Sequence, residues 1–212
     1  MTLTQLADAV VGDAHAPSVA YLGPEGTFSH LVARQVAQQD GRQAAPQVAQ
    51  RDASRNDAGR LVPVTTLADV FEAVKTGQTE LGVVAVENTI AGKVTGAFEG
   101  LLAAPELVAV QEVILPITFS AFTTEPTTAD DPALTQAVAH PHALAQNSRY
   151  IKSHGWDEVP ATSNSAACRD LQRNQVAVAP PGCGPLYGRY ELATSVEDYP
   201  NAQTRFLVIA RR

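Results

Sequence analysis

Apolar and polar residues follow each other along the chain in blocks that predict an alternation of buried strands and amphipathic helices. Continuous apolar runs bounded by turn residues are typical of buried strands. Such runs occur at 18–22, 61–64, 81–86, 137–139, 176–179 and 206–210. Apolar residues recur at helical spacing after Thr27, a good N-cap residue, and again in a helix expected from Thr66 to Lys75. Further helices are expected at 140–154 and after the capping residues at 162–165.

Strands that alternate with helices in this way predict a parallel sheet with helices on both faces. Polar clusters at strand ends occur in both halves of the chain, and two α/β lobes with a cleft between them accommodate this better than one flat sheet. We expect lobe I to comprise about 18–94 and 190–212, and lobe II about 95–189. Residues 1–17 are expected to form a tail, 40–60 an exposed insertion and 180–185 a loop.

The last strand begins with an unusual polar pair, Thr204 and Arg205. Polar groups at the end of a buried strand commonly lie in a cleft rather than in the core. We therefore expect the preceding chain to build a cleft around this pair. The alternative is an ordinary polar turn that precedes a final core strand.

Composition and charge exclude several classes of partner. The formal net charge is −7, which argues against nucleic acid and anionic membranes as main partners but leaves an anionic small molecule open. No apolar run approaches the ~20 residues that span a bilayer. Residues 1–17 lack the pattern of a secretory signal. Cys168 and Cys183 have neither zinc-site nor disulfide-framework spacing, so we expect reduced structural thiols in a cytoplasmic protein.

Four segments, in order along the chain, resemble the motifs of one enzyme family. They match the patterns GPEGTF, (I/V)EN(S/T)xxGxV, HPQALAQ and TRF. In this chain the segments are Gly23-Pro24-Glu25-Gly26-Thr27-Phe28, Val86-Glu87-Asn88-Thr89 with Gly92 and Val94, His140-Pro141 with Ala143-Leu144-Ala145-Gln146, and Thr204-Arg205-Phe206. On these residues the chain resembles the catalytic domain of the prephenate dehydratases.

The resemblance implies two lobes like those of type II periplasmic binding proteins, a cleft active site and a homodimer. It also implies cofactor-free conversion of prephenate to phenylpyruvate for phenylalanine biosynthesis, without a metal. Thr204 would be the catalytic hydroxyl. The substrate-binding residues would be Asn88, Thr89, Glu87, Gly92, Arg205, Phe206, Thr27, Ser163 and Asn164.

The chemistry of the implied reaction fits these residue types. Prephenate is a dianion whose ring hydroxyl leaves as its ring carboxylate is lost, and aromatisation drives both steps. Helix N-termini at Thr27 and Ser163, together with Arg205, could hold the carboxylates. Thr204 is expected to donate a hydrogen bond to the departing oxygen or to relay a proton. For Glu87 we expect a structural role, because a carboxylate beside a dianion is unfavourable.

Several positions depart from the family pattern. Lys93, His142, Asn147 and Asn164 replace the residues usual in the family, which leaves the substrate less certain than the fold. Family members usually continue into an ACT domain, and this sequence stops after the last catalytic strand, so we expect no regulation by phenylalanine through that domain. The alternatives are a non-aromatising prephenate decarboxylase, an arogenate dehydratase, and a non-catalytic protein that binds a small anion.

Overall fold

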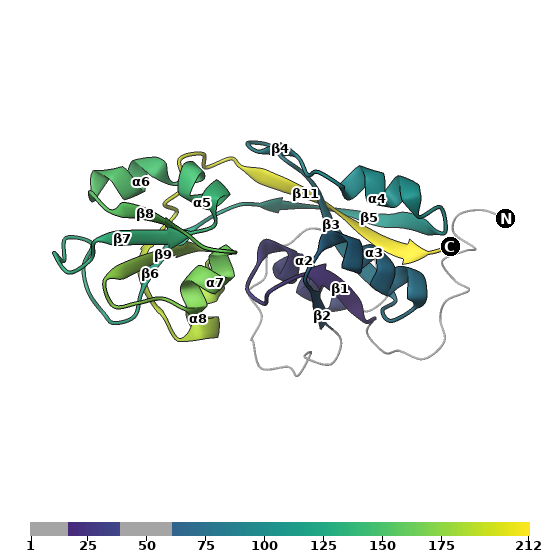
Figure 1. Ribbon diagram of the computed structural model, residues 1–212, viewed down its shortest axis with the longest axis horizontal. Helices are drawn as coiled ribbons and strands as arrows, with labels where there is room; N and C mark the ends of the chain where they lie inside the picture. The colour runs from purple at the N-terminus through teal and green to yellow at the C-terminus, as the bar shows by residue number, and fades with distance from the viewer. Residues whose placement is uncertain (1–16, 39–60) are drawn as a thin grey trace.

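The computed structural model describes residues 17–38 and 61–212, which form two lobes, each built on one sheet (Figure 1). The first sheet has the strand order β2-β1-β3-β11-β5, with β4 paired to β3, and the second has the order β10-β6-β9-β7-β8. The strands of the first sheet are β1 (Val19–Leu22), β2 (Leu61–Val64), β3 (Leu81–Asn88), β4 (Gly92–Lys93), β5 (Leu107–Pro116) and β11 (Gln203–Arg211). Those of the second are β6 (Ser120–Thr123), β7 (Gln136–Ala139), β8 (Asp157–Pro160), β9 (Gln175–Ala179) and β10 (Tyr190–Thr194).

Helices cover the sheets of both lobes. Those of the first lobe are α2 (Phe28–Gln38), α3 (Leu67–Thr76) and α4 (Ala97–Ala103), and those of the second are α5 (Pro141–Gln146), α6 (Ser148–Ser153), α7 (Asn164–Arg169) and α8 (Cys183–Tyr187). The first sheet separates two apolar clusters. Val32 and Val36 of α2 pack with Phe206 and Val208 on one face. Helices α3 and α4 pack with Ile209 on the other face.

Both sheets are mixed, which corrects the expectation of a parallel sheet. Strand β1 runs parallel to β2 and β3, whereas β11 runs antiparallel to both β3 and β5. In the second sheet β7 is parallel to β8 and β9, but β6 is antiparallel to β9 and β10. Alternating strands and helices indicate local βαβ units. They carry no information about a strand such as β11, which returns to the first sheet from the other lobe.

Two connecting segments join the lobes, one after β5 and one before β11, and they are bonded to each other. The Ile117 amide donates to the Ala202 carbonyl oxygen (2.8 Å), and the Val196 amide donates to that of Phe119 (3.1 Å). The Glu197 carboxylate accepts from the Phe119 amide at 2.8 Å. Sheet membership differs from the expected lobe limits at both connections, because β5 pairs within the first sheet and β10 within the second.

Two local expectations in the second lobe are also corrected. The expected loop at 180–185 ends inside helix α8, where Gly184 lies against the ring of Phe122 and leaves no room for a Cβ. The expected helix at 140–154 is broken at Asn147, which is buried and donates its side-chain amide to the Ala143 carbonyl oxygen at 2.7 Å. The expected insertion at 40–60 and nearly all of the tail at 1–17 lie outside the described residues.

Candidate active site

Asn88 is the last residue of β3, and Thr204 is the second residue of β11, which begins directly after a segment that connects the lobes. They are paired across the two antiparallel strands, and the Asn88 Nδ2 atom donates to Thr204 Oγ1 at 2.8 Å. Thr204 is only 8% exposed, so this bond lies in a partly dry environment. Two motifs that are 116 residues apart in the chain thus form one unit.

The amide orientation of Asn88 is determined by its own turn. Its Oδ1 atom accepts hydrogen bonds from the backbone amides of Ile90 (2.9 Å) and Ala91 (2.8 Å). Because Oδ1 is held there, Nδ2 is the atom that faces Thr204. The Thr204 oxygen is therefore an acceptor towards Asn88, which leaves its own proton for a different acceptor.

Thr89 extends the contact between the two strand ends. Its amide donates to the Gln203 carbonyl oxygen (2.9 Å), and its Oγ1 atom accepts from the Gln203 amide (2.9 Å). Gly92 lies in the exposed β3–β4 hairpin with a φ of 81°, a backbone conformation that favours glycine. Through the two hydrogen bonds between Thr89 and Gln203, the second motif is attached to the strand that carries Thr204.

Arg205 lies on the opposite face of the sheet from Thr204. Its guanidinium is 3.1 Å from the carboxylate of Glu87 and 3.4 Å from that of Glu112. Thr204 instead shares its face with Phe206, which is 1% exposed and packs in the core beside α2. The structure therefore brings Thr204 together with Asn88 and Thr89, and it does not bring Arg205 or Glu87 to the same face.

The capping residues predicted at the two helix starts have their side chains engaged locally. The Thr27 hydroxyl donates to the carbonyl oxygens of Leu22 and Pro24 and accepts from the His30 amide. Ser163 caps α7 by accepting from the Ala166 amide at 2.9 Å. The Asn164 Oδ1 atom accepts from the His140 amide at 2.8 Å, which ties together the starts of α5 and α7. The side chains of Thr27, Ser163 and Asn164 therefore position backbone.

A loop of the first lobe, Gly23–Thr27, touches the second lobe. The Glu25 carbonyl oxygen accepts from the hydroxyls of Ser165 and Tyr187, and the Gly26 carbonyl oxygen accepts from the Cys183 thiol at 3.2 Å. Sequence reasoning missed these three side chains as site residues. The two glycines of the GPEG motif were the only signal in the sequence. They indicate that the backbone comes close to another part of the protein, but they do not identify that part.

Burial perturbs two titratable groups beneath this loop. The Gly26 amide donates to His30 Nδ1 at 3.0 Å, so the imidazole is neutral and its proton is on Nε2. Desolvation, with a smaller contribution from Arg34, lowers the pKa of His30 to about 4. Burial, together with the charge of Glu25, raises the pKa of Tyr21 to about 12. Both groups are therefore uncharged at neutral pH.

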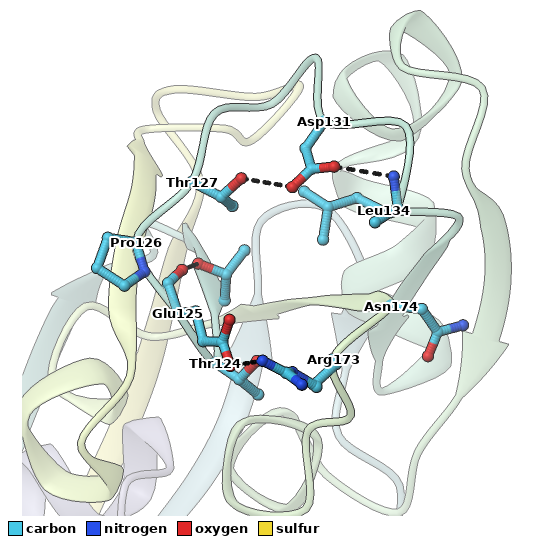
Figure 2. Close-up of a pocket in the computed structure, with 10 residues that line it drawn as sticks. Thr124, Glu125, Pro126, Thr127, Asp131, Leu134, Arg173 and Asn174 are labelled. Atoms are coloured by element: carbon cyan, nitrogen blue, oxygen red, sulfur yellow. Dashed lines mark hydrogen bonds and ion pairs between the residues drawn. The ribbon is translucent and has the colours of Figure 1, made fainter.

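A separate hollow of about 370 Å³ opens in the second lobe, away from the predicted residues (Figure 2). Its lining contains both polar and apolar residues, and its charged side chains already have partners within the lobe. Asp131 accepts from the Thr127 hydroxyl (2.7 Å) and from the Ala133 amide (2.9 Å), and Arg173 forms an ion pair with Glu125. We assign the candidate site to the Asn88–Thr204 unit, because none of the residues of the four motifs lines this hollow.

Among residues 17–38 and 61–212, no group of three or more His, Cys, Asp or Glu side chains is arranged as a metal site. In the same part of the chain no helix is both long and apolar enough to cross a bilayer. Cys168 and Cys183 are both fully buried free thiols that lie against each other.

Comparisons of sequence and structure with known proteins found several relatives of this chain. The prephenate dehydratase of Mycolicibacterium vanbaalenii is 33% identical over 199 residues, which cover 92% of this chain and 62% of that protein. The structure of the prephenate dehydratase of Staphylococcus aureus is 29% identical with a TM-score of 0.72, and the match covers 92% of this chain and 66% of that one. The structure of GqqA, described as a novel type of quorum quenching acylase, is 26% identical with a TM-score of 0.74 and coverages of 92% and 64%.

These matches and the four motifs identify the family. This chain spans about three fifths of the length of the curated relative from Mycolicibacterium vanbaalenii. The family model for prephenate dehydratase matches residues 19–212, which contain all four motifs and both lobes. The chain therefore belongs to the prephenate dehydratase family.

Proposed function

We propose that this chain is a carbon–oxygen lyase that converts prephenate to phenylpyruvate, carbon dioxide and water in phenylalanine biosynthesis. The observation that carries the proposal is the 2.8 Å hydrogen bond from Asn88 Nδ2 to Thr204 Oγ1. It joins the second and fourth motifs at the ends of two neighbouring strands, near the boundary between the lobes.

The reaction needs one hydrogen-bond donor at the leaving oxygen. As the ring carboxylate departs as CO₂, the electrons of the broken C–C bond enter the ring, and the C–O bond to the ring hydroxyl breaks. The departing oxygen takes up one proton and leaves as water. A donor aimed at this oxygen stabilises the charge that develops on it in the transition state.

Thr204 is oriented to be that donor. The amides of Ile90 and Ala91 hold the Asn88 oxygen, and the Asn88 nitrogen donates to Thr204. Every bond in this series runs in the same direction, so the Thr204 proton is the free end. Hydrogen bonds in such a series polarise one another, which makes the last hydroxyl a better donor.

Backbone amides are the donors that we assign to the substrate carboxylates. Because Arg205 is engaged by two glutamates on the other face, we do not assign it a carboxylate. The first amides of α2, just after Thr27, have no acceptor within the helix and lie at the positive end of its dipole. The side chains of Asn88 and Thr89 complete the proposed contacts, together with the α7 start at Ser163 and Asn164.

The test is incubation of the purified chain with prephenate. Phenylpyruvate, followed by its absorbance in alkali, is the expected product. Dihydro-4-hydroxyphenylpyruvate would instead establish a non-aromatising decarboxylase, and faster turnover of arogenate to phenylalanine would establish an arogenate dehydratase. Binding of prephenate without turnover would establish an anion-binding protein. The acylase described for GqqA, at 26% identity, is a reason to measure the reaction directly.

A homodimer in the cytoplasm remains part of the proposal and rests on the family resemblance. Sedimentation velocity of the purified chain tests the dimer. A sedimentation coefficient that corresponds to one 22.4 kDa chain at assay concentration would contradict it.

A further inference from the structure

The loop that precedes α2 is held from both sides. On the first-lobe side, the Gly26 amide donates to His30 and the Thr27 hydroxyl donates to two carbonyl oxygens. On the second-lobe side, Ser165 of α7 and Tyr187 of α8 both contact the Glu25 carbonyl oxygen, with the Tyr187 hydroxyl at 2.8 Å. The two hydroxyls also lie 2.9 Å from each other.

This contact depends on close approach of the backbone. A Cβ atom added to Gly26 would lie 2.7 Å from Ser165 Oγ, 3.0 Å from Cys183 Sγ and 3.1 Å from Leu186 Cδ2. All three atoms belong to the second lobe. The glycine therefore lets the two lobes meet at this point as well as at their connecting segments.

We infer that Ser165 and Tyr187 are positioning residues, forming a latch that holds the Glu25–Gly26 loop of the first lobe against the second. This inference rests on the proposed function, because the latch is assigned to the same site. The Glu25 carbonyl oxygen that the latch holds lies three residues before Phe28, the first residue of α2, whose first amides are the proposed carboxylate donors. Ser165 lies two residues after the α7 cap, Ser163.

The latch raises the fraction of molecules in which the two lobes lie correctly against each other, which is called the apposed form below. A substrate that binds only the apposed form has an apparent affinity reduced by the fraction of molecules in that form. Loss of the latch lowers this fraction and raises KM, while kcat is retained once the substrate has drawn the lobes together. Substitution of a residue that is needed only for folding would lower thermal stability, but it would not raise KM while leaving kcat unchanged.

The two hydroxyls share one acceptor, so we expect them to compensate for each other. In S165A the Tyr187 hydroxyl still donates to Glu25, and in Y187F the Ser165 hydroxyl does so. Burial raises the pKa of Tyr187, and the phenol keeps its proton for this bond. The double variant loses both donors, and its effect is expected to exceed the sum of the single effects.

The experiment measures two properties of S165A, Y187F and the double variant. One is amide hydrogen exchange in the segment 23–31, which requires no substrate, and the other is KM and kcat for prephenate. The matched controls are S153A, whose hydroxyl donates to the Tyr150 carbonyl oxygen within the second lobe, and Y190F, whose phenol is half exposed.

In the double variant we expect exchange in 23–31 and KM each to rise by about fivefold, the factor that one ordinary hydrogen bond supplies, with kcat nearly unchanged. Unchanged exchange in 23–31, or an equal rise throughout the second lobe, would overturn the latch. If the wild type does not turn over prephenate, the proposed function fails while the exchange data still decide the latch.

Discussion

Thr204 and Arg205 are adjacent in β11 and lie on opposite faces of the first sheet. Thr204 is opposite Asn88 and Leu115, and it shares their face with the apolar cluster beside α2. Arg205 is opposite Glu87 and forms an ion pair with it. Successive side chains of a strand alternate between its two faces. The proposed donor Thr204 and its neighbour Arg205 therefore lie on different faces of the sheet, and this division leads to the predictions below.

Removal of the Thr204 hydroxyl is expected to stop turnover with the fold intact. T204A should lower kcat for prephenate by about 100- to 1,000-fold, the range for deletion of one donor to a developing oxyanion. T204S keeps the hydroxyl and should retain most of the activity. T127A, which removes a threonine hydroxyl from the second lobe, is the control for a general effect of Thr→Ala. Activity of T204A near that of wild type, in a stopped assay for phenylpyruvate, would exclude Thr204 as the donor.

The direction of the Asn88–Thr204 bond can be reversed by substitution. In N88D both side-chain oxygens are acceptors, so the Thr204 proton turns towards the new carboxylate and away from the substrate. In N88A the Thr204 hydroxyl is merely released. We therefore expect kcat to be lower in N88D than in N88A, with steady-state kinetics as the measurement. Equal kcat values, or a higher value in N88D, would show that the direction of this hydrogen bond does not affect turnover.

Arg205 is expected to matter little for substrate binding. Its ion pairs with Glu87 and Glu112 join side chains that are each more than 40% exposed, and such pairs contribute about 0–1 kcal/mol to stability. R205Q should therefore lower the free energy of unfolding by less than about 1 kcal/mol and change KM by less than about threefold. E112Q, which removes one partner, is the matched variant for urea unfolding. A large increase in KM for R205Q alone would place the guanidinium on the substrate.

His30 is expected to make the protein less stable in acid. Its pKa is about 4 in the folded chain and 6.5 in the unfolded one, so between these values the unfolded chain binds more protons. The free energy of unfolding is therefore highest, as far as His30 is concerned, above pH 6.5. It decreases as the pH falls towards 4, by about 3 kcal/mol at most.

The measurement is urea unfolding of the wild type and of H30Q between pH 7 and pH 4.5. A glutamine oxygen can still accept from the Gly26 amide but does not titrate. H30Q should therefore lose less stability than the wild type over this interval. Parallel pH dependences for the two proteins would show that His30 does not titrate on unfolding.

The sequence by itself determined the family and most of the local structure. Four motifs in order along the chain were sufficient for the resemblance, and a family model that matches residues 19–212 confirms it. The capping residues Thr27 and Ser163 correctly marked the starts of α2 and α7, and the helix expected from Thr66 begins one residue later, at Leu67. These signals are local, because a cap or an apolar repeat acts within about one turn or a few residues of strand.

The tertiary structure alone decided which of these residues meet. The Asn88–Thr204 bond spans 116 residues and depends on the register of β11 against β3, which follows from the packing of both sheet faces. The contact of Ser165 and Tyr187 with the Glu25–Gly26 loop depends on how the two lobes sit against each other. No periodicity within either segment encodes that placement. The sequence therefore shows which chemical groups are present, and the tertiary structure decides which of them lie close enough to act together.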